Sequence, residues 1–191
     1  MRLFLAIELP AEIRTSLAAL QRELGQLPAD VKWTVKEHLH LTLRFFGEVD
    51  QQQREHIEGL LAQTAPRLEQ VTAQLGKPGC FPDAGLPRVL WVGFEQGQAA
   101  LRMIASTLDA ALSATELTPE DRAFVPHVTI GRSRSSRGMR ELGGALSHTA
   151  WRPPAAFVVG ELTLFESVLS SAGPTYTTLS RWPLTPTRPS A

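Results

Sequence analysis

The stretch 38-HLHLTLRFF-46 separates into two sets when every second residue is taken. One set, from Leu39 to Phe45, is apolar, whereas the other set, from His38 to Arg44, carries imidazole, hydroxyl and guanidinium groups. A β-strand sends successive side chains to opposite faces. The stretch therefore predicts a strand with one face in the core and one polar face.

The same formula returns at 127-HVTI-130, which matches 40-HLTL-43 in its order of histidine, apolar residue, threonine and apolar residue. The copies lie 87 positions apart (127 minus 40), nearly half of the chain. Each copy follows a predicted strand–helix unit. This repeat predicts two similar lobes, and each lobe would bring one His-x-Thr strand to a shared cleft.

Composition limits the kinds of partner and compartment. The chain has 191 residues and a formal net charge of zero, so it lacks the broad basic field that drives general nucleic-acid binding. Cys80 is its only cysteine, which excludes a disulfide framework and predicts a reducing, cytoplasmic location. The apolar run near the N-terminus spans only about six residues, too few for a membrane span. We expect no membrane association.

The hydrophobic periodicity predicts alternating strands and helices. We expect strands at 2–9, 31–35, 38–49, 68–76, 88–95 and 127–133, helices at 11–24, 51–65 and 97–112, and a closing strand pair at 155–168 and 175–184. The segment 76–87 is rich in glycine and proline and predicts a turn region. Residues 1–184 are therefore expected to form a single bilobal domain, and the polar, proline-rich tail 185–191 is expected to be disordered.

Two histidines on a shared cleft favour acid–base chemistry on a phosphodiester. The pKa of an imidazole is ~6.5, so the ring can give or take a proton at neutral pH. One histidine can act as general acid and the other as general base in a single displacement. Phosphoryl transfer places the attacking and leaving oxygens on opposite sides of phosphorus. The threonine two positions after each histidine would share its face and could bind the phosphate oxygens.

The repeated motif and its flanks resemble the two-histidine phosphoesterase superfamily, and within it the RNA 2′,3′-cyclic phosphodiesterases, also called 2′-5′ RNA ligases. The resemblance is carried by 2–10, 31–49, 88–95, 124–132 and 162–184. It implies an α/β fold of the α+β type, with two pseudo-symmetric lobes, antiparallel sheets lining a central cleft and helices outside.

The resemblance also implies an activity. The family opens RNA 2′,3′-cyclic phosphate ends to 2′-phosphomonoesters by metal-independent two-histidine catalysis without a cofactor, and members also join RNA halves reversibly through 2′-5′ linkages. The implied partners are RNA ends or small nucleotides with a 2′,3′-cyclic phosphate. We expect a monomer.

Carried over residue by residue, the family motifs fall on His40 and His127 as catalytic residues and on Thr42 and Thr129 as phosphate-binding residues. The resemblance assigns the acid to His40 and the base to His127. The two motifs are near copies, so their spacing does not choose between these roles.

Further candidates flank the motifs. Arg132, five residues after the second histidine, matches the family's phosphate-binding arginine. Strict alternation turns it away from His127, unless a bulge permitted by Gly131 turns it back. Arg44 is expected on the polar face, either at the substrate or as a solvated side chain. Phe4 is a candidate for stacking on the terminal base, and core packing is the alternative role for its ring. Arginines 132, 134, 137 and 140 are expected to guide an RNA backbone toward the cleft.

Two alternative functions belong to other classes. His38, His40 and His127 would supply three imidazoles to a hydrolytic metal centre, although no carboxylate or cysteine joins them at ligand spacing. Family members usually carry another polar residue in place of His38, so His38 inherits no role. The second alternative is a module that binds RNA ends without catalysis. Turnover of a cyclic phosphate separates that module from an enzyme.

Overall fold

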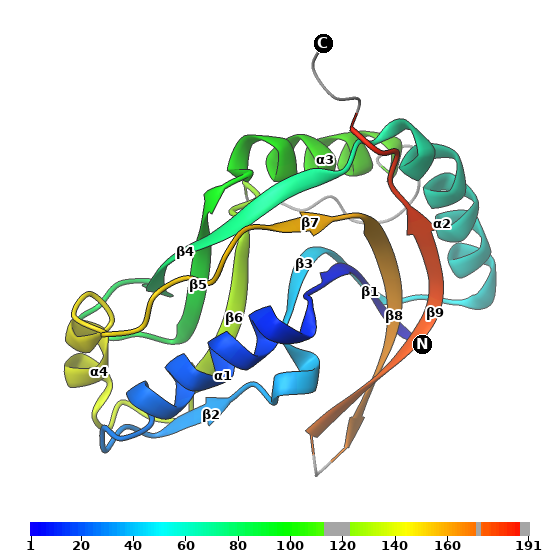
Figure 1. Ribbon diagram of the computed structural model, residues 1–191. Helices are drawn as coiled ribbons and strands as arrows, with labels where there is room; N and C mark the ends of the chain where they lie inside the picture. The colour runs from blue at the N-terminus through cyan, green and yellow to red at the C-terminus, as the bar shows by residue number, and fades with distance from the viewer. Residues whose placement is uncertain (113–122, 171–172, 188–191) are drawn as a thin grey trace.

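A computed structural model of the protein describes residues 1–112, 123–170 and 173–187 (Figure 1). The strands are β1 (Arg2–Glu8), β2 (Val31–Trp33), β3 (His40–Glu48), β4 (Val71–Phe81), β5 (Val89–Gln96), β6 (His127–Ser133), β7 (Phe157–Val159), β8 (Glu161–Ser170) and β9 (Gly173–Pro183). The helices are α1 (Ala11–Leu24), α2 (Gln51–Thr64), α3 (Gln98–Leu112) and α4 (Met139–Ala145), with 3-10 turns η1 (Lys36–His38) and η2 (Ala65–Arg67).

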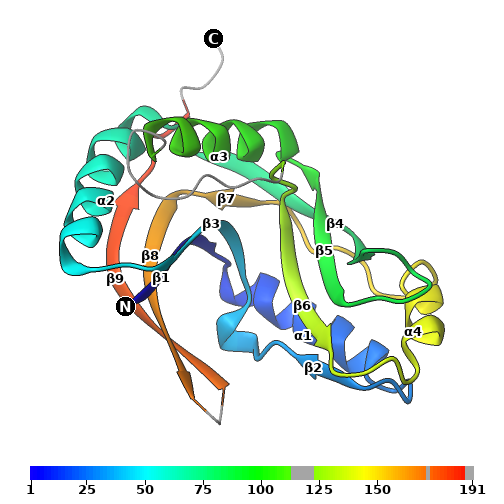
Figure 2. The same cartoon turned by 180° about the vertical axis from the view of Figure 1, so that it is seen from behind.

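The strands of the described residues form one curled antiparallel sheet in the order β7-β4-β5-β6-β3-β1-β8-β9, with β2 paired to β6. Both views show β3 and β6 in the middle, with β8 and β9 on one side and β4 and β5 on the other (Figures 1 and 2). The two expected lobes are the two halves of this sheet, and they meet where β3 lies beside β6. The expected α+β architecture is confirmed.

One face of the sheet carries the hydrophobic core. Leu3, Leu5 and Ile7 of β1 pack there with the apolar rows of the three longer helices, such as Leu17 of α1. The alternate residues Phe4 and Ala6 point to the other face, where they join a separate small cluster. The three longer helices therefore pack on the face that carries Leu3, Leu5 and Ile7. We call the opposite face, which carries His40 and His127, the histidine face.

Most expected elements are confirmed, with four differences. The strand expected at 155–168 is divided into β7, which pairs with β4, and β8, which pairs with β9. The turn region expected at 76–87 is wrong in its first half, because β4 continues to Phe81 along β5. The short helix α4 was missed, since its seven residues hold two glycines and little periodicity. The strand expected from His38 begins at His40, after the turn η1.

The expected tail begins with anchored residues. The Thr185 amide donates to the Leu68 carbonyl, and the Thr187 hydroxyl donates to the Gln70 carbonyl. Residues 188–191 lie outside the described part of the chain. None of the helices described is long and apolar enough to cross a bilayer.

Candidate active site

The two His-x-Thr motifs lie side by side at the centre of the sheet. Leu41 of β3 pairs with Val128 of β6 in antiparallel register, and both side chains are fully buried. Paired residues of neighbouring strands point to the same face, so the residues before and after them point to the opposite one. The four motif side chains, those of His40, Thr42, His127 and Thr129, therefore lie together on the histidine face.

A β-bulge follows the first motif and reverses the faces of the next two residues. Ala6 of β1 pairs with Thr42, but Leu5 pairs with Arg44, so Leu43 is left without a partner. An extra residue in one strand shifts the alternation by one. Arg44 consequently enters the core side, where it is 3% exposed and forms an ion pair with Asp109 of α3. The prediction that Arg44 shares the face of His40 is wrong.

The second motif is followed by a bulge at the equivalent position. Trp91 of β5 pairs with Thr129 and Leu90 with Gly131, which leaves Ile130 without a partner. This bulge turns Arg132 toward the histidine face, in register with Val89. Burial raises the pKa of Tyr176, and the charge of Arg132 opposes that shift. The register therefore places Arg132 on the histidine face, which is the orientation that strict alternation excluded.

Both histidines are held by the same local hydrogen bond. The Nδ1–H of His40 donates to the carbonyl of His38 at 2.7 Å, and that of His127 donates to the carbonyl of Val125 at 2.6 Å. A carbonyl oxygen only accepts, so Nδ1 carries the hydrogen in each ring. Nε2 is then the atom that takes or gives the second proton. In His40, this Nε2 accepts a hydrogen bond from the Thr42 hydroxyl at 2.9 Å.

The surroundings favour the neutral form of both rings. Burial lowers the pKa of His40 to about 4, the bond to the His38 carbonyl opposes the shift, and the charge of His38 adds to it. Burial also lowers the pKa of His127, the Val125 carbonyl opposes, and the Arg132 guanidinium adds to the lowering. The protonated form of each ring is therefore disfavoured unless a nearby anion compensates its positive charge.

Aromatic rings surround each histidine. Phe4 lies under His40, with ring centroids 5.0 Å apart, and is stacked on Phe165 at 5.1 Å. Phe4 is only 2% exposed, so its ring offers no free face to a base. Of the two roles considered for Phe4, its burial in a small cluster with Ala6 and Phe165 favours core packing over stacking on a base. On the other half of the sheet, Phe81 and Trp91 approach His127 edge-on at 5.4 and 6.2 Å.

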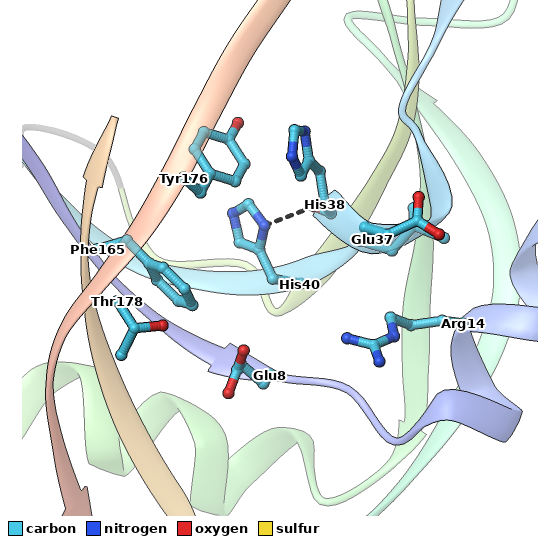
Figure 3. Close-up of a pocket in the computed structure, with 9 residues that line it drawn as sticks. Glu8, Arg14, Glu37, His38, His40, Phe165, Tyr176 and Thr178 are labelled. Carbon is cyan, nitrogen blue, oxygen red and sulfur yellow. Dashed lines mark hydrogen bonds between the residues drawn. The ribbon is translucent and has the colours of Figure 1, made fainter. Parts of the chain in front are cut away.

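A pocket opens beside His40. Its walls come from β1, α1, η1, β3, β8 and β9 and include Glu8, Arg14, Tyr176 and Thr178. Figure 3 shows the His40 ring between Tyr176 and Glu8, with its Nδ1 bonded toward His38. His38 packs on Tyr176 at 4.4 Å between centroids. The pocket combines an aromatic wall with carboxylate, guanidinium and hydroxyl groups, which are groups that suit a sugar or base.

Phe45 is a candidate that the sequence pattern concealed. It pairs with Phe4 of β1, on the histidine face, and is 53% exposed. It stands five residues after His40 (45 minus 40), as Arg132 stands five residues after His127 (132 minus 127). The two bulges therefore place an aromatic ring and a guanidinium at equivalent positions. The apparent apolar series from Leu39 to Phe45 hid this role, and only knowledge of the bulge reveals it.

The described residues contain no group of three histidine, cysteine, aspartate or glutamate side chains placed to hold a metal ion. His38 faces Tyr176, and its carbonyl rather than its ring contacts His40. The three-histidine metal centre therefore has no donor set in this part of the chain.

Comparisons with known proteins agree with this geometry. Residues 9–169 match the model of the 2′-5′ RNA ligase superfamily. The chain is 31% identical to an RNA 2′,3′-cyclic phosphodiesterase of Methanothermobacter thermautotrophicus, over 92% of this chain and 95% of that protein. It is 32% identical to the protein of that name from Escherichia coli (strain K12), over 96% and 97% of the two chains.

Solved structures show the same likeness. The crystal structure of E. coli LigT complexed with 3′-AMP superposes with a TM-score of 0.78 and 29% identity, over 96% of this chain and 98% of that chain. Kluyveromyces marxianus Usb1, at 15% identity and a TM-score of 0.58, shares the fold alone.

Proposed function

The chain belongs to the 2′-5′ RNA ligase superfamily, and from this premise we propose that it opens terminal RNA 2′,3′-cyclic phosphates to 2′-phosphates. The observation that carries the proposal is the pairing of Leu41 with Val128. This pair brings two His-x-Thr motifs to one face, so that a phosphate between them meets two imidazoles and two hydroxyls. The relatives named RNA 2′,3′-cyclic phosphodiesterase support the same substrate class.

The ring opening needs one proton taken and one proton given. Water attacks phosphorus opposite O3′, and the bond from phosphorus to O3′ breaks. In the proposal, Nε2 of His127 takes the proton of the water, and Nε2 of His40 gives a proton to O3′. Before the next turnover, His40 must regain a proton and His127 must lose one. Both transfers use the nitrogen that the backbone carbonyls leave open.

The charge of the substrate supplies the protonation that His40 needs as an acid. In the free protein, burial lowers the pKa of His40 to about 4, which favours the neutral ring at neutral pH. A phosphodiester carries one negative charge, and an opposite charge within ~4–6 Å stabilises a protonated imidazole. Binding of the substrate would thus raise the pKa of His40 and prepare it for proton donation.

Thr42, Thr129 and Arg132 would hold the non-bridging oxygens. The two hydroxyls flank the Leu41–Val128 pair, and the guanidinium fork of Arg132 suits two phosphate oxygens. Donors that are fixed before the reaction stabilise the charge that develops in the transition state. Positioned side chains would therefore perform this hydrolysis without a metal ion or a nucleotide cofactor.

The proposal also extends to a second reaction and to the oligomeric state and location of the protein. The pocket beside His40 and the exposed Phe45 ring stand on either side of the motif in β3, so that groups on both sides of the phosphate find a binding surface. This arrangement supports reversible 2′-5′ ligation as a second reaction, in which a ribose hydroxyl replaces water. We further propose a cytoplasmic location, with which the single cysteine and its free thiol are in keeping, and a monomeric state.

The test is an oligonucleotide that ends in a 2′,3′-cyclic phosphate. We expect a 2′-phosphate product, which phosphatase sensitivity and phosphorus NMR distinguish from the 3′-phosphate. A double variant His40→Ala/His127→Ala serves as the control for contaminating nucleases. Binding of the oligonucleotide without turnover would support the non-catalytic alternative, and a 3′-phosphate product would exclude the proposed direction of ring opening.

A further inference from the structure

Arg132 reaches the histidine face only because of the bulge at Ile130. Register pairs join Trp91 to Thr129 and Leu90 to Gly131, so one residue of β6 is skipped. Without that extra residue, the two-residue period would turn Arg132 to the core side, with Val128 and Ile130. The position of the guanidinium therefore depends on a local irregularity of β6.

Gln21 of α1 contacts this bulge directly. Its side-chain Nε2 donates to the carbonyl of Ile130 at 2.8 Å and to the carbonyl of Thr34 at 2.7 Å. The Thr34 amide also donates to the Ile130 carbonyl, at 3.0 Å. Gln21 is buried, and it is the polar member of the inward row of α1, whose other buried residues are Ile13, Leu17, Leu20 and Leu24.

The chemistry of the amide fits the requirement of the bulge. A bulge leaves backbone groups outside the regular ladder, and a buried carbonyl without a hydrogen-bond partner is destabilising. A glutamine amide has two hydrogens, and Gln21 uses Nε2 to bridge the end of β2 and the skipped residue of β6. An apolar side chain at this position would remove the donor to the Thr34 carbonyl and would leave the Ile130 carbonyl with the Thr34 amide as its remaining donor.

Gly131 shows how tightly the same point is packed. A Cβ atom at this position would lie 2.9 Å from Cγ1 of Val31 and 3.0 Å from Cε3 of Trp33. Val31 and Trp33 of β2 thus lie against Gly131, just after the bulge, while Gln21 binds the carbonyl of Ile130 in the bulge. Both contacts therefore fix the backbone that sets the direction of Arg132, the next residue.

We propose that Gln21 is a positioning residue for the phosphate site, which acts through the Ile130 bulge to aim Arg132 at the substrate. Gln21 does not touch the substrate. The proposal rests on the proposed function only in taking a phosphate as the group that Arg132 meets.

The first experiment is a double-mutant cycle. Gln21→Leu keeps the volume and removes both donated bonds, and Arg132→Ala removes the guanidinium. We expect Gln21→Leu to lower kcat/KM for the cyclic-phosphate oligonucleotide about 10-fold in the wild type but less than about 2-fold in the Arg132→Ala background, because groups that act as one unit are not additive. Gln74→Leu is the matched control, since Gln74 also donates to a backbone carbonyl, that of Pro154, away from the bulge.

The second experiment needs no substrate. Burial is the main cause of the lowered pKa of His127, and the charge of Arg132 adds to it. If Gln21 aims Arg132, Gln21→Leu should raise the pKa of His127 in the free protein toward its value in Arg132→Ala, as followed by NMR of the imidazole. Gln74→Leu should leave that pKa unchanged. A merely structural role for Gln21 would lower the melting temperature without this shift.

The outcomes separate the two proposals. Equal losses from Gln21→Leu in both backgrounds, or an unchanged pKa of His127, would overturn the role of Gln21. If the cyclic phosphate is not a substrate but the pKa shifts as expected, only the proposed function fails. Should Gln21→Leu not fold, Gln21→Met, with its unbranched side chain, gives the same two readouts.

Discussion

Leu41 and Val128 face each other across the junction of the two halves of the sheet, and each stands between the histidine and the threonine of its own motif. The antiparallel register makes the two motifs equivalent by a local twofold relation. Their equal hydrogen bonds to the carbonyls of His38 and Val125 repeat this equivalence. Any division of labour between the histidines must therefore come from their neighbours. Those neighbours differ, because the charge of Arg132 acts on His127, whereas the rings of Phe4, Phe165 and Tyr176 lie around His40.

The first prediction concerns pH. The productive state has one histidine charged and the other neutral, so kcat/KM should be bell-shaped. Burial lowers the pKa of His40 to about 4, and burial with the charge of Arg132 lowers that of His127 below 6.5. The singly protonated pair is most populated between these two values. We expect kcat/KM to rise as pH passes about 4 and to fall as pH passes the lowered pKa of His127.

The profile of kcat supplies the control for this prediction. The bound phosphate anion favours the charged form of both rings, so both limbs should move to higher pH in kcat than in kcat/KM. The apparent values belong to the coupled pair rather than to either ring. A kcat/KM maximum above pH 7 that coincides with the kcat maximum would contradict the lowered pKa values.

The second prediction separates two arginines that the sequence presents alike. Arg132→Ala should lower kcat/KM about 10- to 100-fold, the range expected for a hydrogen bond to a charged group, with little change in the free energy of unfolding. Arg44→Ala should instead destabilise the fold by about 1–3 kcal/mol, because the buried side chain of Arg44 and its ion pair with the partly exposed Asp109 are lost. Its folded fraction should keep full kcat.

Arg134→Ala is the matched control for Arg132→Ala. Arg134 follows β6 and is exposed, so its charge should only raise the local concentration of RNA. That contribution is screened by salt and is recovered at low ionic strength. Equal and salt-sensitive losses at both positions would remove Arg132 from the phosphate site.

Arg44 and Arg132 also show where sequence-based prediction stops. The motif residues could be predicted because His-x-Thr occurs twice with suitable flanks, and each copy obeys the two-residue period up to its threonine. Beyond Thr42 and Thr129 the two-residue alternation fails in both strands, because a β-bulge shifts each strand by one residue relative to its neighbour. The partners that stabilise one bulge come from α1, more than a hundred residues away along the chain. No local pattern around Arg132 contains that information.

The same limit applies to β4. Its segment 76–81 holds two glycines and a proline, which favour a turn when taken alone. In the fold, Gly79 is required because the Trp91 ring lies where its Cβ would be, 2.4 Å from Cη2. A long-range contact therefore explains a glycine that local propensity interprets as a turn. The core strand β1, by contrast, was predictable, because its residues from Leu3 to Ile7 form one continuous apolar run that is buried on both faces.

The third prediction concerns the exposed ring of Phe45. We expect Phe45→Ala to weaken binding of the oligonucleotide by about 1–3 kcal/mol, the value of one base–aromatic stack, with little effect on the melting temperature. Phe45→Trp should restore the affinity, because indole also stacks. The contrast is Phe4→Ala, which should cost about 3–5 kcal/mol of stability, since Phe4 is buried. A loss of stability at Phe45 equal to that at Phe4 would show that both rings serve packing alone.

The fourth prediction tests the metal alternative. Hydrolysis should proceed in EDTA at the rate observed without it, because two imidazoles and fixed donors supply both proton transfers. His38→Asn should keep a rate of the same order as the wild type, since the carbonyl of residue 38, not its ring, holds His40. Loss of activity on chelation and its recovery with zinc, together with loss in His38→Asn, would restore the three-histidine centre.

The last prediction assigns the acid and the base. The pH profile alone does not distinguish them, since both assignments require one proton on the pair. Either His40→Ala or His127→Ala should lower the rate about 10²- to 10⁴-fold on the natural substrate. A cyclic substrate with sulfur in place of the leaving O3′ separates the roles, because a thiolate departs without a proton. If His40 is the acid, this substrate should largely restore the rate of His40→Ala and leave His127→Ala slow, since the attacking water still needs a base. Restoration of His127→Ala instead would reverse the assignment, and the burial that lowers the pKa of His40 to about 4 would then mark His40 as the base.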